Sequence, residues 1–469
     1  MRRSFRITAF GFALLALAAG CSLVNSLDEL KPADDGKFTG DTRPVAPGVV
    51  LEDAGFGPTN VGSKDAESEA AAATAFSPIV VGGEANVGDS GALAPVLAII
   101  DSKTGQEHGT RESMWVAGIA HDDLRDLWYI FEAKNYVVAT ASETVKVHTR
   151  RLDSKTGAWT ELSVFEGPPL VYYDAIAVTR ERVSYVAHPI PGNPANKNRL
   201  ITLNTTDPAK VSLGDDTTLL DEMPRGMTGT PSGTGPGGNL SLINVGKTGT
   251  SDCEVLEAGA GIRCQVRIRH YLIPNGGIPQ VLSPSLFGGM SSFGLPGYGS
   301  VICGGSPDEV VVQPGVGPDN GTQTITTLDY SVGTETGSTK FSMSTAVGAP
   351  TLLRKAAIDN PRRIVFVVEA NNDTAMYAVP LSGSGAQKIN LRHSGQSVYY
   401  DPASETAFAP FNQGEGKTFS AIKVSGGKDN VPLSLKERQP SSNPGGDWDP
   451  PSDLRPNILG ISLTGQTCP

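Results

Sequence analysis

The sequence predicts an all-β fold, and three observations support this. Glycine and proline are abundant, with 55 and 34 residues, and both residue types favour turns over helix interiors. No long stretch of the chain has the 3.6-residue apolar periodicity of an amphipathic helix. After residue 76, short apolar segments alternate with turn residues, which is typical of a succession of short strands.

A recurring strand end predicts how these strands are grouped. An apolar strand followed by a Gly- or Asp-containing turn recurs about every 50 residues, a period typical of β-propeller blades. The strand ends lie at 99–105, 151–157, 200–206, 270–277, 326–333, 378–385, 421–427 and 460–466. If the last of these strands completes the first blade, the ring has seven blades. Six or eight blades, and two tandem β-sandwiches, are the alternatives.

Two short motifs repeat within this period. Residues 101–105 and 153–157 both read DSKTG, and residues 171–174 and 398–401 both read VYYD. In DSKTG the Asp side chain begins a turn and the Gly supplies a positive φ. With the following Ala158 and Trp159, this motif resembles the outer hairpin of quinoprotein and other propellers. The resemblance covers one hairpin per repeat and implies only the fold.

A further element of the repeat is an aspartate in a turn before a strand, found at Asp122, Asp174, Asp359 and Asp401. One hypothesis is a ring of carboxylates on one face, which would bind Ca²⁺ through oxygen atoms. We favour the alternative that each Asp caps a tight turn, because the aspartates recur together with the turn. His121, Asp122 and Asp123 form the only compact group that could ligate another metal, and there too we favour a surface turn.

The first twenty residues have the layout of a signal peptide. Three arginines precede an apolar run over residues 7–19, which is too short to span a bilayer comfortably. The run ends in Leu17-Ala18-Ala19-Gly20-Cys21, which resembles the lipobox of bacterial lipoproteins. The resemblance implies cleavage before Cys21 and a lipid anchor, with palmitate among its acyl chains, on the Cys21 thiol. By analogy with sorting in enteric bacteria, Ser22 favours the outer membrane of the cell envelope.

The chain is therefore expected to have three parts: a signal peptide at 1–20, a lipid-anchored tether at 21–75 and a propeller at 76–469. The tether is rich in Pro, Gly, Asp and Ser and lacks strand alternation. We expect it to be disordered, and as a flexible coil it would reach roughly 40 Å.

The net charge argues against one class of partner. It is −11 for the whole chain and becomes −14 once the three arginines of the signal peptide are removed. Nucleic acid is an improbable partner for so acidic a chain, because its phosphates need clustered Lys and Arg. We expect the membrane contact to come from the lipid and not from surface charge.

Four cysteines remain besides Cys21, an even number that favours two disulfides in an oxidising compartment. We favour Cys253–Cys264, because a short polar loop separates two strand-like segments, and Cys303–Cys468, which would tie the C-terminus to the body. Free thiols are the alternative. No pair has C-x-x-C spacing, which argues against a zinc or redox site.

No catalytic motif is present, since the chain lacks G-x-S-x-G, a P-loop and a dinucleotide fingerprint. The glycine-rich stretch at 226–239 is expected to be a loop. A Pro/Gly-rich insertion at 440–456 carries Asp447, Trp448 and Asp449. An exposed Trp448 between two carboxylates could stack on a sugar or hold a peptide. We favour the alternative, in which Trp448 packs back onto the sheet.

These features together predict an envelope lipoprotein whose propeller binds a protein or glycan partner, without catalysis and without a cofactor. One alternative is a propeller enzyme, such as a glycan hydrolase or lyase, acting on envelope or extracellular polymers. Its carboxylates would come from different blades and leave no local motif. The other alternative is a structural component of an envelope assembly.

Overall fold

The computed structural model describes residues 76–463 except for short segments. These are 88–91, 134–143, 171–175, 189–196, 215–217, 221–222, 232–236, 246–252, 256–261, 274–279, 284–288, 292–299, 307, 314–321, 330–333, 343–355, 369–374, 383–384, 392–397, 411–418, 429–430 and 444–445. The predicted signal peptide and tether, with Cys21, lie outside the described residues, as does Cys468. Within the described part, thirty-one strands form seven antiparallel sheets, and no helix is long and apolar enough to cross a bilayer.

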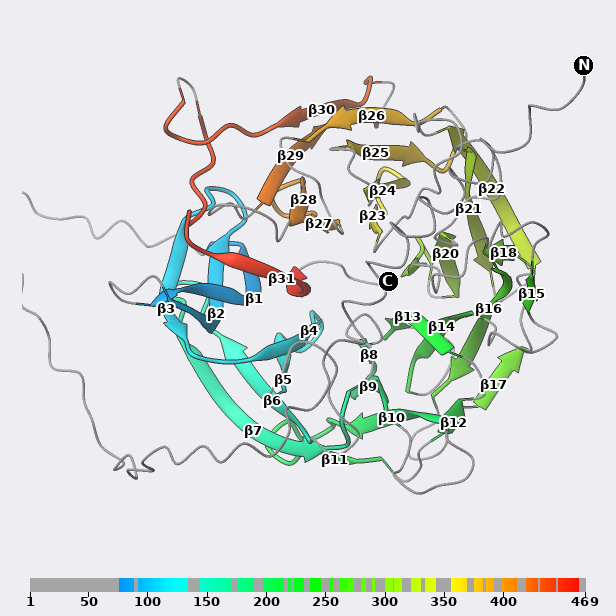
Figure 1. Ribbon diagram of the computed structural model, residues 1–469, viewed down its shortest axis with the longest axis horizontal. Helices are drawn as coiled ribbons and strands as arrows, with labels where there is room; N and C mark the ends of the chain where they lie inside the picture. Colours follow the sequence, from blue (N-terminus) through cyan, green and yellow to red (C-terminus); the bar gives the residue numbers. More distant parts are fainter. Residues whose placement is uncertain are drawn as a thin grey trace, which may run out of the picture. The chain divides into compact units, whose positions relative to one another are not determined.

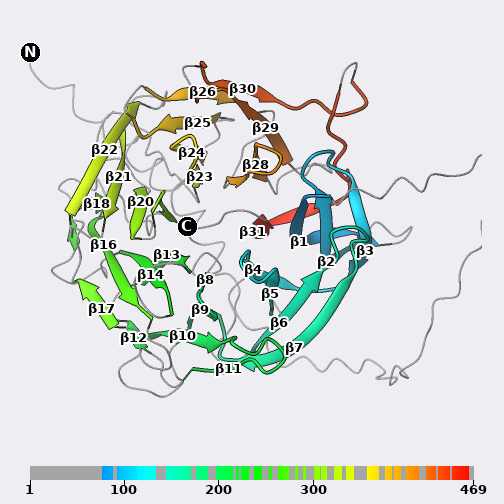
Figure 2. The same cartoon turned by 180° about the vertical axis from the view of Figure 1, so that it is seen from behind.

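Each sheet is one blade of a propeller, and its strands are counted from the central axis outward (Figures 1 and 2). Four blades are simple four-stranded meanders. Blade 2 has β4 (Val116–Asp122), β5 (Leu127–Glu132), β6 (Val145–Leu152) and β7 (Trp159–Gly167). Blade 5 has β19 (Ser300–Cys303), β20 (Glu309–Gln313), β21 (Thr322–Asp329) and β22 (Thr334–Ser342). Blade 6 has β23 (Ala357–Asp359), β24 (Ile364–Val368), β25 (Ala375–Pro380) and β26 (Gln387–Asn390), and blade 7 has β27 (Tyr399–Asp401), β28 (Thr406–Pro410), β29 (Phe419–Ser425) and β30 (Ser434–Glu437).

Two blades carry additional strands. Blade 3 consists of β8 (Ile176–Thr179), β9 (Arg182–Ala187), β10 (Asn198–Asn204) and β11 (Ser212–Leu213), with β12 (Thr218–Leu220) also paired to β10. Blade 4 has the order β13 (Met223–Thr230), β14 (Asn239–Val245), β16 (Ile262–Leu272) and β15 (Cys253–Val255). In that blade β17 (Gln280–Ser283) and β18 (Gly289–Ser291) also pair with β16.

Blade 1 joins the two ends of the described chain. Its second, third and fourth strands are β1 (Pro78–Val87), β2 (Ala92–Asp101) and β3 (Glu107–Glu112), while its innermost strand is β31 (Arg455–Leu463). Seven of the eight predicted strand ends are the third strands of the seven blades, and the eighth is β31. The seven-bladed propeller is therefore confirmed, and the β-sandwich alternative is wrong.

The core is divided into clusters that lie between neighbouring blades. In β5, Trp128 and Ile130 belong to the cluster between blades 1 and 2. Tyr129 and Phe131, which point to the other side of the same strand, belong to the cluster between blades 2 and 3. Because both faces of each sheet are covered, second strands such as β5, β20 and β24 are near-continuous apolar runs.

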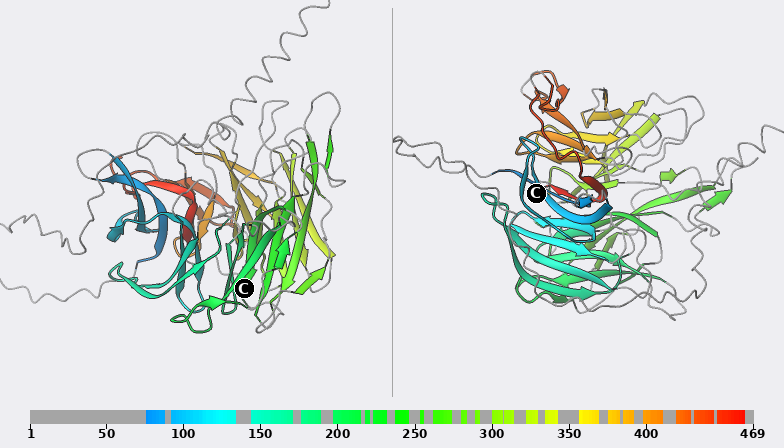
Figure 3. Two further views of the ribbon diagram at one scale, coloured as in Figure 1. Left: turned by 60° about the horizontal axis from the view of Figure 1, so that its bottom comes forward. Right: turned by 60° about the vertical axis from the view of Figure 1, so that its left-hand side comes forward.

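The direction of the strands gives the propeller two different faces (Figure 3). Since neighbouring strands are antiparallel, the connections from first to second strand and from third to fourth strand share one end, here called the turn face. The other end, called the opposite face, carries the connections from second to third strand. In blades 2 and 3 those connections, residues 133–144 and 188–197, are longer than the first hairpins, residues 123–126 and 180–181.

Two local expectations are wrong. The glycine-rich loop expected at 226–239 begins only after Thr230, because the preceding residues belong to β13. Gly229 suits that innermost strand, since a Cβ there would lie 2.0 Å from the carbonyl oxygen of Val178 in blade 3. Asp174 does not precede the second strand of blade 3: it lies before β8, outside the described residues, and Thr179 ends β8 instead.

Candidate functional site

Three of the repeated aspartates begin hairpins of one form on the turn face. Asp122, Asp359 and Asp401 end the first strands of blades 2, 6 and 7, and each is at most 3% exposed. Each carboxylate accepts a hydrogen bond from the backbone N–H three residues later, at 3.0–3.3 Å. The turn-capping interpretation is confirmed for these three residues, and their oxygen atoms are occupied by the protein itself.

The last residue of the first hairpin has a positive φ in four blades and is not glycine in any of them. The φ angles are 51° at Asp126, 54° at Glu181, 55° at Arg363 and 47° at Glu405. A side chain in this region costs on the order of 1 kcal/mol. Each of the four side chains makes a contact that glycine lacks, with His121, Thr206, Glu309 and Arg362 respectively.

In blade 2 the capping aspartate also takes part in the contact with the next blade. Arg125 donates from Nε to Asp122 Oδ2 at 2.6 Å. Its Nη1 reaches the carbonyl oxygen of Thr205 at 2.6 Å, and its Nη2 reaches Thr205 Oγ1 at 2.8 Å. Thr205 directly follows β10, the third strand of blade 3. The arginine thus joins the first hairpin of one blade to the third strand of the next.

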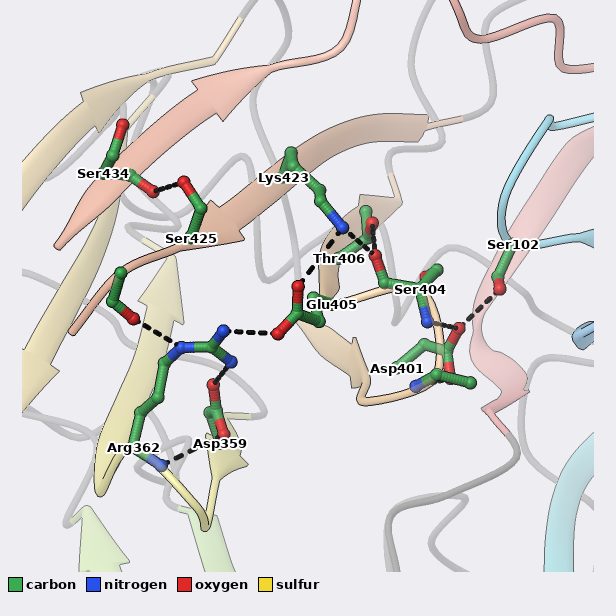
Figure 4. A network of polar contacts seen from close by, with 12 residues as sticks. Ser102, Asp359, Arg362, Asp401, Ser404, Glu405, Thr406, Lys423, Ser425 and Ser434 are labelled. Carbon is green, nitrogen blue, oxygen red and sulfur yellow. Dashed lines mark hydrogen bonds and ion pairs between the residues drawn. The ribbon is translucent and has the colours of Figure 1, made fainter. Parts of the chain in front are cut away.

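Blade 6 repeats this arrangement toward blade 7 (Figure 4). Arg362 donates to Asp359 Oδ2 at 2.7 Å and to the carbonyl oxygen of Gly426 at 2.7 Å. Gly426 directly follows β29, the third strand of blade 7. The same guanidinium forms an ion pair with Glu405, which holds the pKa of that carboxyl below its ordinary value.

Blade 7 meets blade 1 through hydroxyl groups instead. Ser404 stands where the other two blades have arginine. Asp401 accepts a hydrogen bond from the hydroxyl of Ser102 (Figure 4) and, at 3.3 Å, another from the hydroxyl of Ser77. Ser102 directly follows β2, the third strand of blade 1. Its carbonyl oxygen accepts a bond from Arg438 at 3.1 Å, so an arginine reaches the same position from a different part of the chain.

Polar contacts cross the other four interfaces between blades on the same face. They are Phe76 N to Ser154 O at 3.0 Å between blades 1 and 2, Arg180 Nε to Pro231 O at 3.1 Å between blades 3 and 4, Asn239 Nδ2 to Asp308 Oδ1 at 2.7 Å between blades 4 and 5, and Arg363 Nη1 to Glu309 Oε2 at 2.8 Å between blades 5 and 6. Every interface between neighbouring blades therefore has a described polar contact on the turn face. The polar groups of this face hold the ring together.

The candidate metal group His121, Asp122 and Asp123 is not assembled as a metal site. Asp122 is turned to Arg125, while His121 bonds Asp123 through Nδ1 and Asp126 through Nε2 at 3.4 Å. Burial lowers the pKa of His121, but the hydrogen bonds to the two carboxylates outweigh it, and the net pKa is raised. Across the described residues, no group of three or more His, Cys, Asp and Glu is spaced to hold a metal.

In the 440–456 insertion the favoured interpretation of Trp448 is confirmed, and the alternative of an exposed tryptophan that stacks on a ligand is wrong. Trp448 is 2% exposed and belongs to the apolar cluster between blades 7 and 1. Asp447 and Asp449 on either side of it are exposed, and Asp447 pairs with Arg438 at 3.2 Å. The indole packs back onto the sheet because the interface between the first and last blades leaves an apolar space for it.

A cluster of ionisable groups that the sequence analysis missed lies between blades 1 and 2. His148 bonds Glu132 at 3.0 Å through Nε2 and Glu161 at 3.2 Å through Nδ1. Arg150 forms ion pairs with Glu161 at 2.8 Å and with Glu112 of blade 1 at 2.6 Å. Three carboxylates thus surround one arginine and one histidine. The sequence pattern that could have indicated this cluster is the placement of Lys146, His148 and Arg150 at every second position of β6. This spacing puts polar groups on one face of a strand.

Ser241 and His270 form a hydrogen-bonded pair that has no access to substrate. Ser241 Oγ lies 2.7 Å from His270 Nδ1, and both residues are 1% exposed. Burial lowers the pKa of His270 to about 4, so the imidazole is neutral at pH 7. A hydrolase needs its serine open to the substrate, and this pair is instead a part of blade 4.

The cysteines agree with the expected framework without completing it. Cys253 lies directly opposite Cys264 in the ladder of β15 and β16, a register compatible with a cross-strand disulfide. Cys303 is buried and disulfide-bonded, and its partner lies outside the described side chains. Both pairings therefore stay predictions.

No family model and no curated protein sequence matches this chain. Solved structures are similar in fold. A periplasmic gluconolactonase of Pseudomonas aeruginosa is 10% identical, with 81% of this chain and 98% of that chain covered and a TM-score of 0.49. A putative 6-phosphogluconolactonase of Bacteroides fragilis is 9% identical, with coverages of 82% and 98% and a TM-score of 0.48. At such identities the similarity concerns the fold, which the seven sheets already establish.

Proposed function

We propose that this chain is a lipid-anchored protein of the cell envelope, located in the outer membrane, whose propeller binds a protein or glycan partner without catalysis. The difference between the two faces carries the proposal. The aspartates and arginines of the turn face are engaged between blades, while the long connections of blades 2 and 3 leave from the opposite face. Long connections on a rigid β scaffold often carry binding, so we place the partner on the opposite face.

The place where the chain enters the propeller agrees with this orientation. Phe76 N donates to Ser154 O at 3.0 Å, and Ser77 N donates to Asp101 Oδ1 at 3.3 Å. Both acceptors belong to turn-face hairpins, and β1 begins at the next residue. The described chain therefore enters the propeller at its turn face.

The anchor is tested by replacing the cysteine that would carry it. The Cys21→Ala variant should accumulate as uncleaved precursor and should not incorporate labelled palmitate, because the thiol is the acylated group. Fractionation of envelopes by detergent partitioning gives the readout. If mature-sized protein of this variant still enters the detergent phase, the anchor is wrong.

The binding face is tested by site-specific photo-crosslinking in intact envelopes. A photoreactive residue is placed at Leu93 or Glu166 at the opposite-face ends of blades 1 and 2, and at Leu124 or Lys155 in turn-face hairpins as matched controls. All four side chains are exposed. We expect partner adducts from the first two positions only. Adducts confined to the two turn-face positions would contradict the proposal.

The pair Glu132 and Glu161 does not favour the enzymatic alternative. A glycosidase needs two carboxyl groups with the scissile bond between them, and the side chain of His148 lies between Glu132 and Glu161. Purified protein should therefore leave envelope and extracellular glycans uncut in a chain-length assay. Recovery of the protein only within one large assembly of fixed composition would favour a structural component.

A further inference from the structure

The chain closes its ring through a ladder that is interrupted by a register shift. β1 pairs with β2 over ten consecutive residue pairs. With β31 it pairs only as Ile79–Val81 opposite Ile461–Leu463 and as Gly83 and Glu84 opposite Pro456 and Arg455. The register shifts between these two parts, and residues 457–460 have no partner in the ladder with β1. Nearly half of the innermost strand, near its middle, therefore contributes no pair with β1, although the five pairs that remain exceed the three that join the first two strands in each of blades 6 and 7.

A second element spans the same interface. Residues 438–443 and 446–454, here called the strap, connect β30 of blade 7 to β31 of blade 1. Asp449 N donates to Thr104 O at 2.8 Å, and Arg438 donates to Ser102 O at 3.1 Å and to Lys103 O. The strap thus covers the third-to-fourth-strand hairpin of blade 1.

Trp448 anchors the strap between the two blades. Its ring centroid lies 5.4 Å from that of Phe408 in blade 7, and it belongs to the same cluster as Ile79 and Val81 of blade 1. The guanidinium of Arg438 lies 5.0 Å from the centre of the indole on its other side, within the range of a cation–π contact. The indole therefore touches both blades and the arginine that bonds blade 1.

The far end of the strap is fixed to the outer edge of blade 1. Arg111 on β3 contacts both oxygen atoms of Asp453, at 2.5 and 2.9 Å. The same guanidinium is oriented by Glu107 at 2.7 Å. Paired bonds between guanidinium and carboxylate fix geometry as well as charge, so the strap is held at both ends and in its middle.

We propose that the strap is needed beside the interrupted ladder between β31 and β1 to keep the propeller closed, with Trp448 as its anchor. Release of Trp448 frees the strap and lets β31 leave blade 1, while the other six blades keep their structure. One part of the ring, the strap with β31, can then open locally at blade 1, where the two ends of the described chain meet. Opening of this kind proceeds through contiguous units of lower stability than the whole protein.

Hydrogen exchange of the full chain, followed by mass spectrometry, tests the proposal. Trp448→Ala should speed exchange by at least about 100-fold in residues 455–463 and 78–84, the lower end of what truncating a buried tryptophan is expected to cost, and leave β24 and β25 unchanged. Trp159→Ala, in the outer strand of blade 2, is the matched control and should leave residues 455–463 unchanged. The measurement uses oxidised and reduced protein, because the predicted Cys303–Cys468 disulfide would itself restrain the segment after β31.

Two outcomes would overturn the proposal. One is an equal increase across all seven blades, because the strap would then be part of one cooperative core. The other is unchanged exchange in residues 455–463 of both the oxidised and the reduced protein. If Trp448→Ala does not fold, Trp448→Phe and Arg438→Gln serve instead, and we expect a smaller increase confined to the same two segments.

Discussion

Neighbouring blades are joined differently at two interfaces, the one between blades 6 and 7 and the one between blades 7 and 1. In both, the carbonyl oxygen that follows the third strand accepts a bond from an arginine on the other side, Gly426 O from Arg362 and Ser102 O from Arg438. At the first interface the arginine comes from the hairpin capped by Asp359. At the second it comes from the strap.

The difference follows from covalent continuity. Blades 6 and 7 follow one another along the chain, so one hairpin arginine and an apolar cluster hold them in place. Blade 1 is built from both ends of the described chain, and a closing strand with an interrupted ladder could leave it. The protein adds a buried tryptophan and a second arginine there. The first hairpin thus keeps the same form in blades 6 and 7, while the arginine that binds the next blade comes from a different part of the chain where the ring closes.

The largest effect is expected at the interface between blades 6 and 7. Arg362→Ala leaves the carboxylate of Asp359 buried without its cation, which should lower the free energy of unfolding by about 3–5 kcal/mol. Arg363→Ala is the matched control. Its guanidinium is 37% exposed against 6% for Arg362, so its loss should cost about 1 kcal/mol or less. Urea unfolding gives both values, and equal losses would contradict the role given to Arg362.

A smaller effect is expected from the aspartate between blades 7 and 1. Asp401→Ala removes bonds to two backbone N–H groups and to the hydroxyls of Ser77 and Ser102. Because these partners are neutral, the free energy of unfolding should fall by about 1–3 kcal/mol. Ser102→Ala, which removes one of the bonds, should cost about 1 kcal/mol. If Asp401→Ala lowers the free energy of unfolding more than Arg362→Ala does, the ranking of the two interfaces is wrong.

Acid should weaken the attachment of the strap. Arg111 lowers the pKa of Asp453 below its ordinary value of 3.8 through hydrogen bonds. The stabilisation is complete above pH 3.8 and is lost as the pH falls through the lowered pKa. Since Asp453 is partly exposed, we expect a few tenths of a kcal/mol. Thermal unfolding from pH 7 to pH 2 should show the difference between wild type and Arg111→Gln shrinking in acid; a constant difference would contradict this.

Another small effect tests whether the two arginine positions are interchangeable. Ser404 takes the place that Arg125 and Arg362 occupy in their hairpins. In an Arg438→Ala background, Ser404→Arg should restore about 0.5–1 kcal/mol of the lost free energy of unfolding, the size of one hydrogen bond. In the wild-type background the carbonyl of Ser102 is already engaged, so Ser404→Arg should be neutral or slightly destabilising. A double-mutant cycle measures both changes in the free energy of unfolding. If the effects of Ser404→Arg and Arg438→Ala simply add, the arginine at position 404 does not replace Arg438.

The local chemistry of the repeat was readable in the sequence. The third strands and their DSKTG-like turns predicted seven blades, because each blade buries both faces of its middle strands and ends them in the same turn residues. The aspartates at 122, 359 and 401 were correctly interpreted as turn caps. Asp174 lies outside the described residues, and its turn-cap interpretation stays a prediction: VYYD at 171–174 precedes β8 of blade 3, while Tyr399–Asp401 form β27 of blade 7.

The ionisable cluster around His148 shows what the sequence could not supply. The alternation of β6 indicates a polar strand face, but the partners Glu112, Glu132 and Glu161 come from three other strands and two blades. Trp448 is a similar case. The sequence favoured a Trp448 that packs back onto the sheet, but its partners, Phe408 and the strands of blade 1, appear only in the structure.

The sequence by itself determined the fold class, the number of blades and the capping of the turns, because these depend on residues that are close along the chain. Only the tertiary structure decided which arginine faces which carbonyl, where the ring is closed and which charged groups gather. Those contacts join residues as far apart as Asp401 and Ser102. Their pairing depends on how the blades are ordered around the axis, which no local pattern records.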